Sequence, residues 1–443
     1  MKNSGHIPEV SVLRFLKHAS NIIENPLPFH LRNFNRLGDI FRLKLGFGNS
    51  VIFSRNPKVA QHLLQKNQKN YHKSPIQTKD VAKYVGHGLL TTNGEHWQKQ
   101  RKLIQPAFHK KQLEKLMDSI NAAIQAEVKR IETDQDFDIF PVFNDLAFQT
   151  VVKSLFSSAV GEKEINRLQF ITEAAQKMLV SELRQPFKKW WFRLSGKIQK
   201  HLDLTAEARQ ILKKIVEERK RSSVREDDLL DMLLDARYED GSAMSEDQLL
   251  DEILILFTAG HETTSNALTF TCELLARHPE IQQKLYEDIL QAKTNSENLM
   301  EFLQQSIYAN LVLNESMRLY PPAYFIDRIS LAEDEVEGIK IEPNESLLLS
   351  IYEIHRHKDH WQQPEAFIPE RFEDGKQRKN IAYYPFGAGP RKCIGNNFAM
   401  YEMILAISEV MLKFKIEEKS TPIEITPLIT LKPKNAFLRF TRR

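Results

Sequence analysis

Cys393 is the residue whose setting most clearly indicates chemistry. It stands in the glycine-rich segment FGAGPRKCIG, residues 386–395, and a helical pattern of apolar residues follows directly. A thiolate here would lie near the positive end of a helix dipole and near unpaired backbone N–H groups, which stabilise S⁻. Neither Cys393 nor Cys272, the other of the two cysteines, has the Cys or His spacing typical of zinc or iron–sulfur sites. By this setting alone Cys393 is either a metal-binding thiolate or an ordinary small core residue, whereas we interpret Cys272 as a packing residue; two cysteines without such spacing favour a reducing compartment.

A second chemical segment, AGHETT at residues 259–264, interrupts a long apolar helical pattern. A glycine inside a helix costs about 1 kcal/mol relative to alanine, and a buried carboxylate without a partner costs more. We expect Gly260 to clear space beside the helix and the threonine hydroxyls to compete for backbone carbonyls, so that a small molecule enters a groove. His261 points about 100° away from Glu262 around the helix and is left without a role.

Together the two segments resemble the cytochrome P450 family. Residues 386–395 match the haem-binding signature F-x-x-G-x-R-x-C-x-G at its five defining positions, and residues 259–264 look like the oxygen-binding motif [AG]-G-x-[DE]-T-[TS]. The resemblance implies that Cys393 ligates the iron of haem b (iron protoporphyrin IX) and that Phe386 packs against the ligand loop. It also implies that Arg391 holds a haem propionate, that Gly395 lets the backbone approach the sulfur, and that Ala259 lies beside the cofactor.

The resemblance further implies a reaction. Glu262 and Thr263 would deliver protons while O2, the co-substrate, is activated. The expected enzyme is a haem-thiolate monooxygenase that inserts one oxygen atom into a C–H bond of a small organic substrate, giving hydroxylation or oxidative O-dealkylation.

Two weaker patterns become informative because the two family motifs occur in the same chain. Glu315 and Arg318 share a helix face at i and i+3, and the later segment PERF carries Arg371; in the family these three form a buried structural cluster. Trp97 and Arg101, at i and i+4, resemble a pair that binds a propionate, and Arg328 matches a further propionate-binding arginine.

Substrate contacts are predicted from positions near the haem in the family. They are Tyr84 and Val85 before the Trp97 helix, Phe257 and Ala259 on the long helix, and Tyr324 and Phe325 after Pro321-Pro322. The polar residues around position 80 admit a hydroxylated or methoxylated substrate as well as a lipid or terpenoid.

The chain leaves no room beyond its motifs for a flavin or ferredoxin domain. We therefore expect electrons from NAD(P)H to arrive through a separate ferredoxin or flavodoxin with its reductase. A basic patch could steer such an acidic partner, the alternative being an ordinary solvated helix face; its members would be Lys99, Lys102, Lys110, Lys111 and Lys392.

The elements that must position these residues are mostly helices. Residues 245–278 predict one long buried helix, with Ser245 and Gln248 as a capping box and Pro279 as its stop. Helical patterns fill 94–320, and β-like runs occur before residue 60 and between 329 and 351. No linker is visible, so we expect a mainly α cytochrome P450 fold with a long central helix and small β-sheets, forming a single domain over residues 1–443.

Composition places the chain in the globular class and argues against a disordered or nucleic-acid-binding protein. The chain of 443 residues is 42% hydrophobic and 27% charged, with a net charge of +4 and no basic tract that would follow nucleic acid. The first 25 residues lack a continuous apolar run, so we expect a cytoplasmic protein without a membrane anchor.

Two rival functions stay open at this point. One is a peroxide-dependent haem-thiolate enzyme, disfavoured because Glu262 and Thr263 supply the pair that O2 activation needs. The other is a non-catalytic haem-binding sensor, which requires the Cys393 loop but not the acid–alcohol pair.

Overall fold

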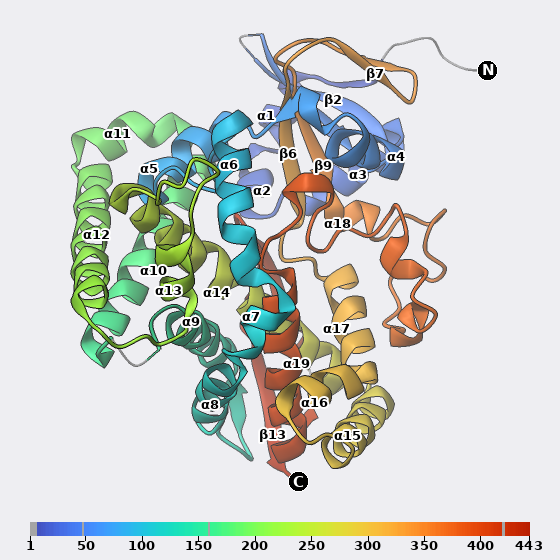
Figure 1. The fold of residues 1–443 in the computed structure, drawn as a ribbon. Coiled ribbons are helices and arrows are strands. Elements are labelled where there is room, and N and C mark those ends of the chain that lie inside the picture. The colour runs from blue at the N-terminus through green and yellow to red at the C-terminus, as the bar shows by residue number, and fades with distance from the viewer. Residues whose placement is uncertain (1–6, 47, 158–159, 419–420) are drawn as a thin grey trace. The chain divides into compact units, whose positions relative to one another are not determined.

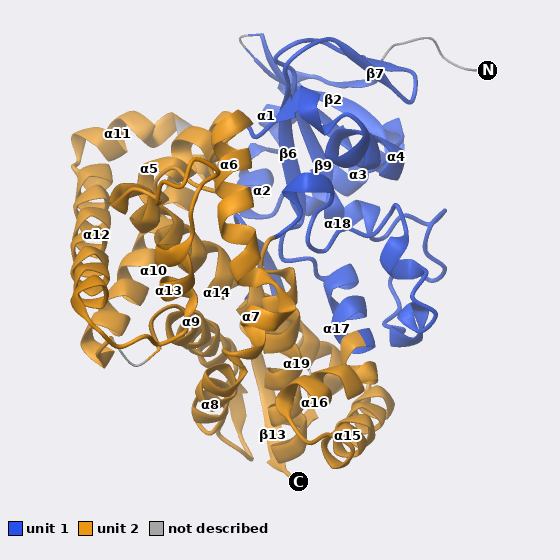
Figure 2. Ribbon diagram, viewed as in Figure 1, with its two compact units in different colours: residues 1–74, 311–393, 424–434 blue, residues 75–310, 394–423, 435–443 orange. Residues whose placement is uncertain are grey.

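The computed structural model describes residues 7–46, 48–157, 160–418 and 421–443. Their backbone forms two compact units, built from residues 1–74, 311–393 and 424–434 and from residues 75–310, 394–423 and 435–443 (Figure 2). Each unit is therefore assembled from segments distant in sequence.

The first unit is built on a six-stranded sheet in the order β1-β2-β3-β9-β6-β4. The β-like runs predicted before residue 60 form β2 and β3, an antiparallel pair in which Phe41 pairs with Phe53 and the two rings stack at 5.1 Å. These rings belong to a buried core with Phe29, Phe34 and Leu43. The strands of this sheet are β1 (Glu9–Val10), β2 (Ile40–Gly46), β3 (Asn49–Ser54), β4 (Tyr71–His72), β6 (Phe325–Ser330) and β9 (Ser346–Ser350).

Helices and two small hairpins complete this unit. The hairpins are β7 (Asp334–Val336) with β8 (Ile339–Ile341), and β11 (Glu424–Pro427) with β12 (Leu431–Lys434). The helices are α1 (Val12–Lys17), α2 (Ala19–Glu24), α3 (Leu27–Leu37), α4 (Pro57–Gln61), most of α17 (Ile307–Leu319) and α18 (Ile351–Ile354). Short helical turns are η1 (His62–Lys66), η2 (Gln68–Asn70), η6 (Pro369–Phe372), η7 (Gln377–Lys379) and η8 (Gly389–Arg391).

The second unit is a helical body around α14 (Glu246–Arg277), the predicted long helix (Figure 1). The side chain of Ser245 accepts a hydrogen bond from the Gln248 N–H at 3.2 Å, and the next helix begins at Pro279. Both predicted ends of the helix are thus confirmed. Because α9 and α19 pack along it, most of its circumference is buried.

The other longer helices of this unit are α6 (Gly94–Ile104), α8 (Met117–Val128), α9 (Phe140–Phe156), α10 (Glu162–Arg184), α12 (Lys197–Arg221), α15 (Pro279–Thr294) and α19 (Asn396–Lys413). Shorter helices and turns are η3 (Ile76–Val81), α5 (Ala82–Val85), η4 (Gln105–Phe108), α7 (Lys110–Glu114), η5 (Pro186–Lys188), α11 (Lys189–Leu194), α13 (Leu229–Asp235) and α16 (Leu299–Gln305). One small sheet joins β10 (Phe414–Glu417), β13 (Phe437–Arg442) and β5 (Asp136–Asp138). The predicted fold, mainly α with a long central helix and small sheets, is confirmed.

Candidate functional site

Cys393 lies on an exposed turn that is closed by backbone hydrogen bonds. The Cys393 N–H donates to the Phe386 carbonyl at 2.9 Å, and the Lys392 N–H donates to the Gly389 carbonyl at 3.0 Å. The thiol-bearing residue is exposed, whereas Cys272 is fully buried in α14. Burial raises the pKa of the Cys272 thiol, which therefore stays protonated and packs as a small apolar group.

The conformation of Gly389 explains why one defining position of the motif is a glycine. Its φ is +68°, and a Cβ there would lie 1.9 Å from the backbone oxygen of Leu64 in η1. No side chain fits that distance, so only glycine lets η8 pack directly on η1. The shape of the Cys393 turn thus depends on a backbone-to-backbone contact.

Two arginines beside this turn concentrate positive charge. Burial and the neighbouring Arg328 guanidinium lower the pKa of Arg391 to about 10. Arg328 is itself buried on β6, and it donates to the carbonyl of Asp327 at 2.7 Å. Because each cation disfavours the other, an anionic group placed between them would be stabilised. This is what a haem propionate requires, so the residues of the turn fit the predicted cofactor.

The structure brings Glu315, Arg318 and Arg371 together. Arg318 donates from Nε and Nη2 to both oxygens of Glu315, at 2.7 and 2.8 Å, and Arg371 donates from Nε at 3.2 Å. Glu315 and Arg318 are 0% exposed. The attraction within a buried ion pair offsets the cost of desolvation only if the remaining donors and acceptors also have hydrogen-bond partners.

Backbone carbonyl groups of the segment before the Cys393 turn accept the remaining hydrogen bonds of Arg318. Arg318 donates to the backbone oxygens of His355, Pro364 and Ala366, at 2.7 to 3.0 Å. Its guanidinium also lies over the ring of Trp361, 5.0 Å from the centroid. One arginine therefore fixes three points of this segment.

His355 extends the cluster to the turn, and no local sequence pattern indicates this role. Its Nδ1 lies 3.2 Å from the Arg318 carbonyl, and its Nε2 accepts from the Tyr384 N–H at 2.8 Å, two residues before Phe386. Burial and the Arg318 charge lower the pKa of His355 to about 3, so the ring is neutral, with Nδ1–H as donor. Glu315, Arg318 and His355 thus form a continuous support for the cysteine loop.

The middle of α14 presents one accessible stripe. Ala259 is exposed and Leu256, Gly260 and Thr263 are half-exposed, at helical spacings that place them on one face. Thr263 donates from Oγ1 to the Ala259 carbonyl at 2.9 Å, while Glu262 is buried. An alcohol on the open face and an acid beside it are the arrangement that proton delivery needs.

Gly260 lies on this partly exposed face and also against α9, and entry of a small molecule beside it stays a prediction. A Cβ at this position would lie 2.9 Å from the Val151 side chain of α9. The missing side chain therefore lets α9 pack closely here. His261 is accounted for in the same way, since its Nδ1 lies 2.6 Å from the Phe257 carbonyl and its ring meets Phe148 edge-on.

A buried acid behind this stripe is absent from the sequence predictions. Glu402 of α19 is 0% exposed. Its carboxyl group accepts a hydrogen bond from the hydroxyl of Thr150 on α9 and is also hydrogen-bonded to the side chain of Thr264 on α14. Burial raises the pKa of Glu402 to about 8, so its carboxyl group is mostly protonated at neutral pH. Thr264 follows Thr263 directly, which ties this neutral acid to the α14 motif.

The remaining predicted cofactor residues lie where their helix periodicity suggests. Trp97 is buried on α6, and Arg101 follows one turn later, donating from Nε to Gln105 at 2.9 Å. Gly395 directly precedes α19. Their contact with a cofactor stays a prediction.

The predicted substrate contacts have packing roles in the structure. Tyr84 is buried and its hydroxyl bonds to Glu182, Phe257 packs between Phe148 and Phe156, and Tyr324 donates to the Leu428 carbonyl at 2.8 Å. Val85 is buried, and Phe325 meets Tyr324 edge-on. Contact of these five residues with a substrate stays a prediction.

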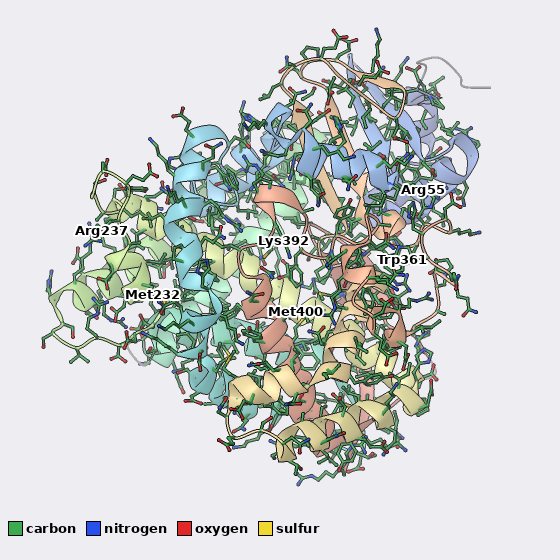
Figure 3. The ribbon with its side chains drawn as sticks, turned by 45° about the vertical axis from the view of Figure 1, so that its right-hand side comes forward. Arg55, Met232, Arg237, Trp361, Lys392 and Met400 are labelled. Atoms are coloured by element: carbon green, nitrogen blue, oxygen red, sulfur yellow. The ribbon has the colours of Figure 1, made fainter. Side chains whose placement is uncertain are left out.

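The proposed basic patch is less uniform than the sequence suggested. Lys102 pairs with Glu239, while Lys99, Lys110 and Lys111 are exposed. Lys392 is exposed on the turn of the other unit (Figure 3). The charge available to steer a partner is therefore reduced by one ion pair.

Neither a membrane-spanning helix nor a metal-binding cluster occurs in the residues that the structure describes. In the ranges between the gaps at 47, 158–159 and 419–420, no helix has the length and apolarity to cross a membrane. No cluster of three or more His, Cys, Asp or Glu side chains in the same ranges could hold a metal ion.

Comparison with known proteins gives one consistent result. Residues 8–440 match the family described as Cytochrome P450. The chain is 26% identical to pentalenene oxygenase of Streptomyces avermitilis, covering 96% of this chain and 95% of that protein. It is 27% identical to cyclooctat-9-en-7-ol 5-monooxygenase of Streptomyces melanosporofaciens, covering 90% and 87%. The crystal structure of the cytochrome P450DA haem domain has the same fold, with a TM-score of 0.87, 21% identity and coverage of 99% and 98%.

Proposed function

This chain belongs to the cytochrome P450 family and is a cytochrome P450 monooxygenase, and from that premise we propose its reaction and the residues that perform it. The reaction is insertion of one oxygen atom from O2 into a C–H bond of a small organic substrate, by hydroxylation or oxidative O-dealkylation. The observation that carries the proposal is the accessible stripe of α14, where Thr263 is half-exposed beside the buried Glu262.

Haem, the cofactor of the family, supplies the iron at which O2 is reduced. Cys393 is its proposed ligand, with Phe386 packed against the ligand loop and Gly395 allowing close approach. Proposed contacts to the propionates and the ring come from Arg391, Arg328, Trp97, Arg101 and Ala259. The mutual repulsion of Arg328 and Arg391 supports the propionate assignment, because a carboxylate between them relieves it.

The proposed proton path uses groups of α14. The Thr263 hydroxyl donates to the Ala259 carbonyl, and rotation about one bond would turn it toward the open face of the helix. Glu262 lies next to it in the chain and can resupply the proton through water. Such a pair allows one proton after another to reach the reacting oxygen without exposing the site to bulk solvent.

Substrate and electron source are parts of the same proposal. The names of the two Streptomyces proteins specify an alkene and an alkenol as their substrates, which supports a mainly apolar organic substrate here. Tyr84, Val85, Phe257, Tyr324 and Phe325 are its proposed contacts. Electrons would come from NAD(P)H through a ferredoxin or flavodoxin with its reductase, in the cytoplasm. A single functional domain over residues 1–443 also stays a prediction.

Spectroscopy and product analysis test the proposal. The reduced protein with CO should show the red-shifted band of thiolate ligation, and Cys393→Ser should lose it while Cys272→Ser keeps it. With redox partners and isotopically heavy O2, the product should carry one heavy oxygen atom. Product formation only with peroxide would favour the peroxide-dependent enzyme, and a CO band without any product would favour the sensor.

A further inference from the structure

A hollow in the second unit lies between α6 and the turn that joins α13 to α14. Its volume is about 1090 Å³, whereas small-molecule sites usually span roughly 300–1,000 Å³. One wall is α6, and the other is a tight antiparallel turn in which Arg237 pairs with Ala243 and the Tyr238 N–H donates to the Ser242 carbonyl at 2.9 Å. Two hydrogen-bonded elements therefore form the hollow, and it has room for an organic ligand.

A buried amide in this hollow has one atom without a partner. Gln100 of α6 is 2% exposed, and its Nε2 donates to the Tyr238 hydroxyl of the opposite wall at 2.6 Å. Its Oε1 has no hydrogen-bond partner among the residues that the structure describes. With the amide turned over, Oε1 would accept from Tyr238 and Nε2 would lack the partner. Because a buried polar atom is destabilised without a hydrogen bond, a bound group that supplies the bond is stabilised there.

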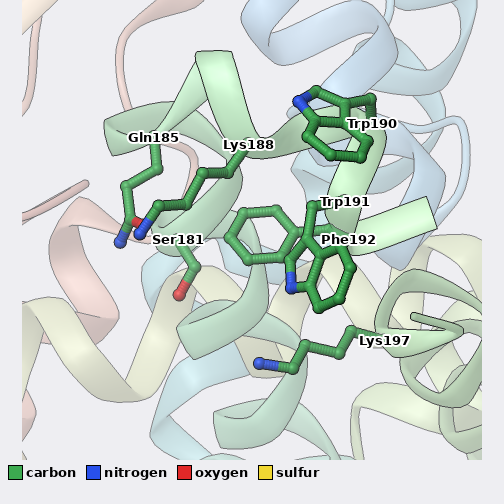
Figure 4. A pocket seen from close by; sticks show the side chains of 7 residues that line it. All are labelled: Ser181, Gln185, Lys188, Trp190, Trp191, Phe192 and Lys197. Carbon is green, nitrogen blue, oxygen red and sulfur yellow. The ribbon is translucent and has the colours of Figure 1, made fainter. Parts of the chain in front are cut away.

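A second hollow in the same unit lacks this feature. It lies beside α11, and the polar side chains that line it are all at least partly exposed (Figure 4); they are Ser181, Gln185, Lys188 and Lys197. Water can solvate each of them, so no polar group in that lining depends on a ligand. The buried amide of Gln100 therefore distinguishes the hollow beside α6 as a candidate binding site.

The charges that line the hollow beside α6 balance. Its Lys and Arg side chains are matched by as many carboxylates, the full set being Lys99, Lys102, Arg237, Glu95, Glu239 and Asp240. Lys102 pairs with Glu239 across the hollow, and Asp240 accepts from the N–H and the hydroxyl of Ser242 at 2.9 and 2.6 Å. An ion of either sign would meet as many like charges as opposite ones. A neutral ligand is therefore favoured.

The rest of the lining consists mostly of side chains that form hydrogen bonds, with one aromatic ring among them. They include His96, Gln98, Tyr238, Ser242, Ser245 and Gln248. Amide and carboxylate groups each present two polar atoms side by side, which suits a pair of neighbouring hydroxyls. The ring of Tyr238 offers an apolar face to the carbon atoms of the same ligand. Such a lining fits a compound rich in hydroxyl groups.

We propose that this hollow, formed by residues 95–103 and 237–248, binds a neutral polyhydroxylated ligand of the sugar class. One ligand hydroxyl would donate to the Gln100 Oε1, and others would bond to the amides and carboxylates of the lining. The sugar ring would pack on Tyr238. The ligand would therefore join α6 to the turn before α14, which Lys102 and Gln100 already connect.

Calorimetric titration of the full-length, haem-loaded protein tests the proposal. With glucose, maltose and trehalose as probes, we expect saturable binding of at least one sugar. Its dissociation constant should change less than about twofold when salt is added, because a neutral ligand is not screened. Citrate and spermidine, which carry opposite charges, should bind much more weakly than that sugar.

Two variants locate the binding. Gln100→Leu removes the buried acceptor and should weaken sugar binding about tenfold, and Tyr238→Ala removes the ring and should weaken it about fivefold. Two controls make the same kinds of change at exposed positions of this unit outside the hollow, and both should stay within about twofold of the wild type. They are Gln283→Leu on α15 and Phe170→Ala on α10.

Each contrary result has a defined meaning. The proposal is overturned if none of the three sugars binds, since the hollow would then hold water alone, or if citrate or spermidine binds more tightly than the sugars. It is also overturned if Gln100→Leu and Tyr238→Ala bind sugar like the wild type, or if the controls lose as much binding as the test variants. None of these measurements requires turnover or a redox partner, so they stand apart from the proposed reaction.

Discussion

Removing the carboxylate of Glu315 is the most direct test of how the cysteine loop is supported. In Glu315→Ala, Arg318 keeps its three backbone carbonyl partners but loses the carboxylate that pairs with it. Arg371 loses its carboxylate acceptor and keeps only its bond to the Gln363 carbonyl among the hydrogen bonds that the structure describes. Because the pair is 0% exposed, water cannot replace the carboxylate without opening the structure. Breaking a buried pair from one side costs about 3–5 kcal/mol of unfolding free energy. Glu315→Gln keeps one oxygen acceptor and should cost about 1.5–3 kcal/mol.

Urea unfolding of the purified protein measures these costs, with intrinsic fluorescence as the signal, because Trp361 lies over the Arg318 guanidinium. The ratio of haem absorbance to protein absorbance should be highest in the wild type, lower in Glu315→Gln and lowest in Glu315→Ala. Glu335→Ala, a change of an exposed glutamate in the same unit, serves as the control and should leave both quantities near wild type. A Glu315→Ala protein with wild-type stability and full haem content would refute the reasoning.

Further predictions concern the turn and the buried acid. Gly389→Ala should lower the free energy of unfolding by several kcal/mol more than Gly338→Ala. Both positions have positive φ, but only the Cβ at 389 would meet a backbone atom, the Leu64 oxygen at 1.9 Å. Equal urea midpoints for the two variants would contradict this prediction. Glu402, with its pKa raised from 4.5 to about 8, is protonated in the folded chain and ionised in the unfolded chain between those pH values. Its contribution to stability is therefore fully present below about pH 4.5 and is lost as pH rises toward 8. The variant Glu402→Gln should flatten the decline of the unfolding free energy between these pH values. An unchanged slope would show that Glu402 is not the titrating group.

The motifs of the site could be predicted because their spacing is local. The ends of α14 follow from the Ser245 cap and from Pro279, both of which act within one helical turn. Glu315 and Arg318 share a face for the same reason. The third member, Arg371, came from the order of motifs in the family, since nothing within the PERF segment indicates its partner.

The residues that sequence reasoning missed depend on which surfaces meet. Glu402, Thr150 and Thr264 come from three helices far apart in the chain, and no local pattern indicates that they converge. Val151 lies beside Gly260 only because α9 packs along α14, so this helix contact of the glycine could not be predicted from local spacing.

The sequence by itself determined the family, the helical class, the Cys393 turn and the positions of the acid and alcohol in α14, because caps, periodicity and motif spacing act over a few residues. Only the tertiary structure decided that His355 links Arg318 to the turn, that Glu402 is held protonated, and that the rings of Phe187, Trp190 and Trp191 stay exposed. Burial, proton affinity and exposure are set by neighbours from distant segments, and those neighbours are fixed only when the helices and strands have packed.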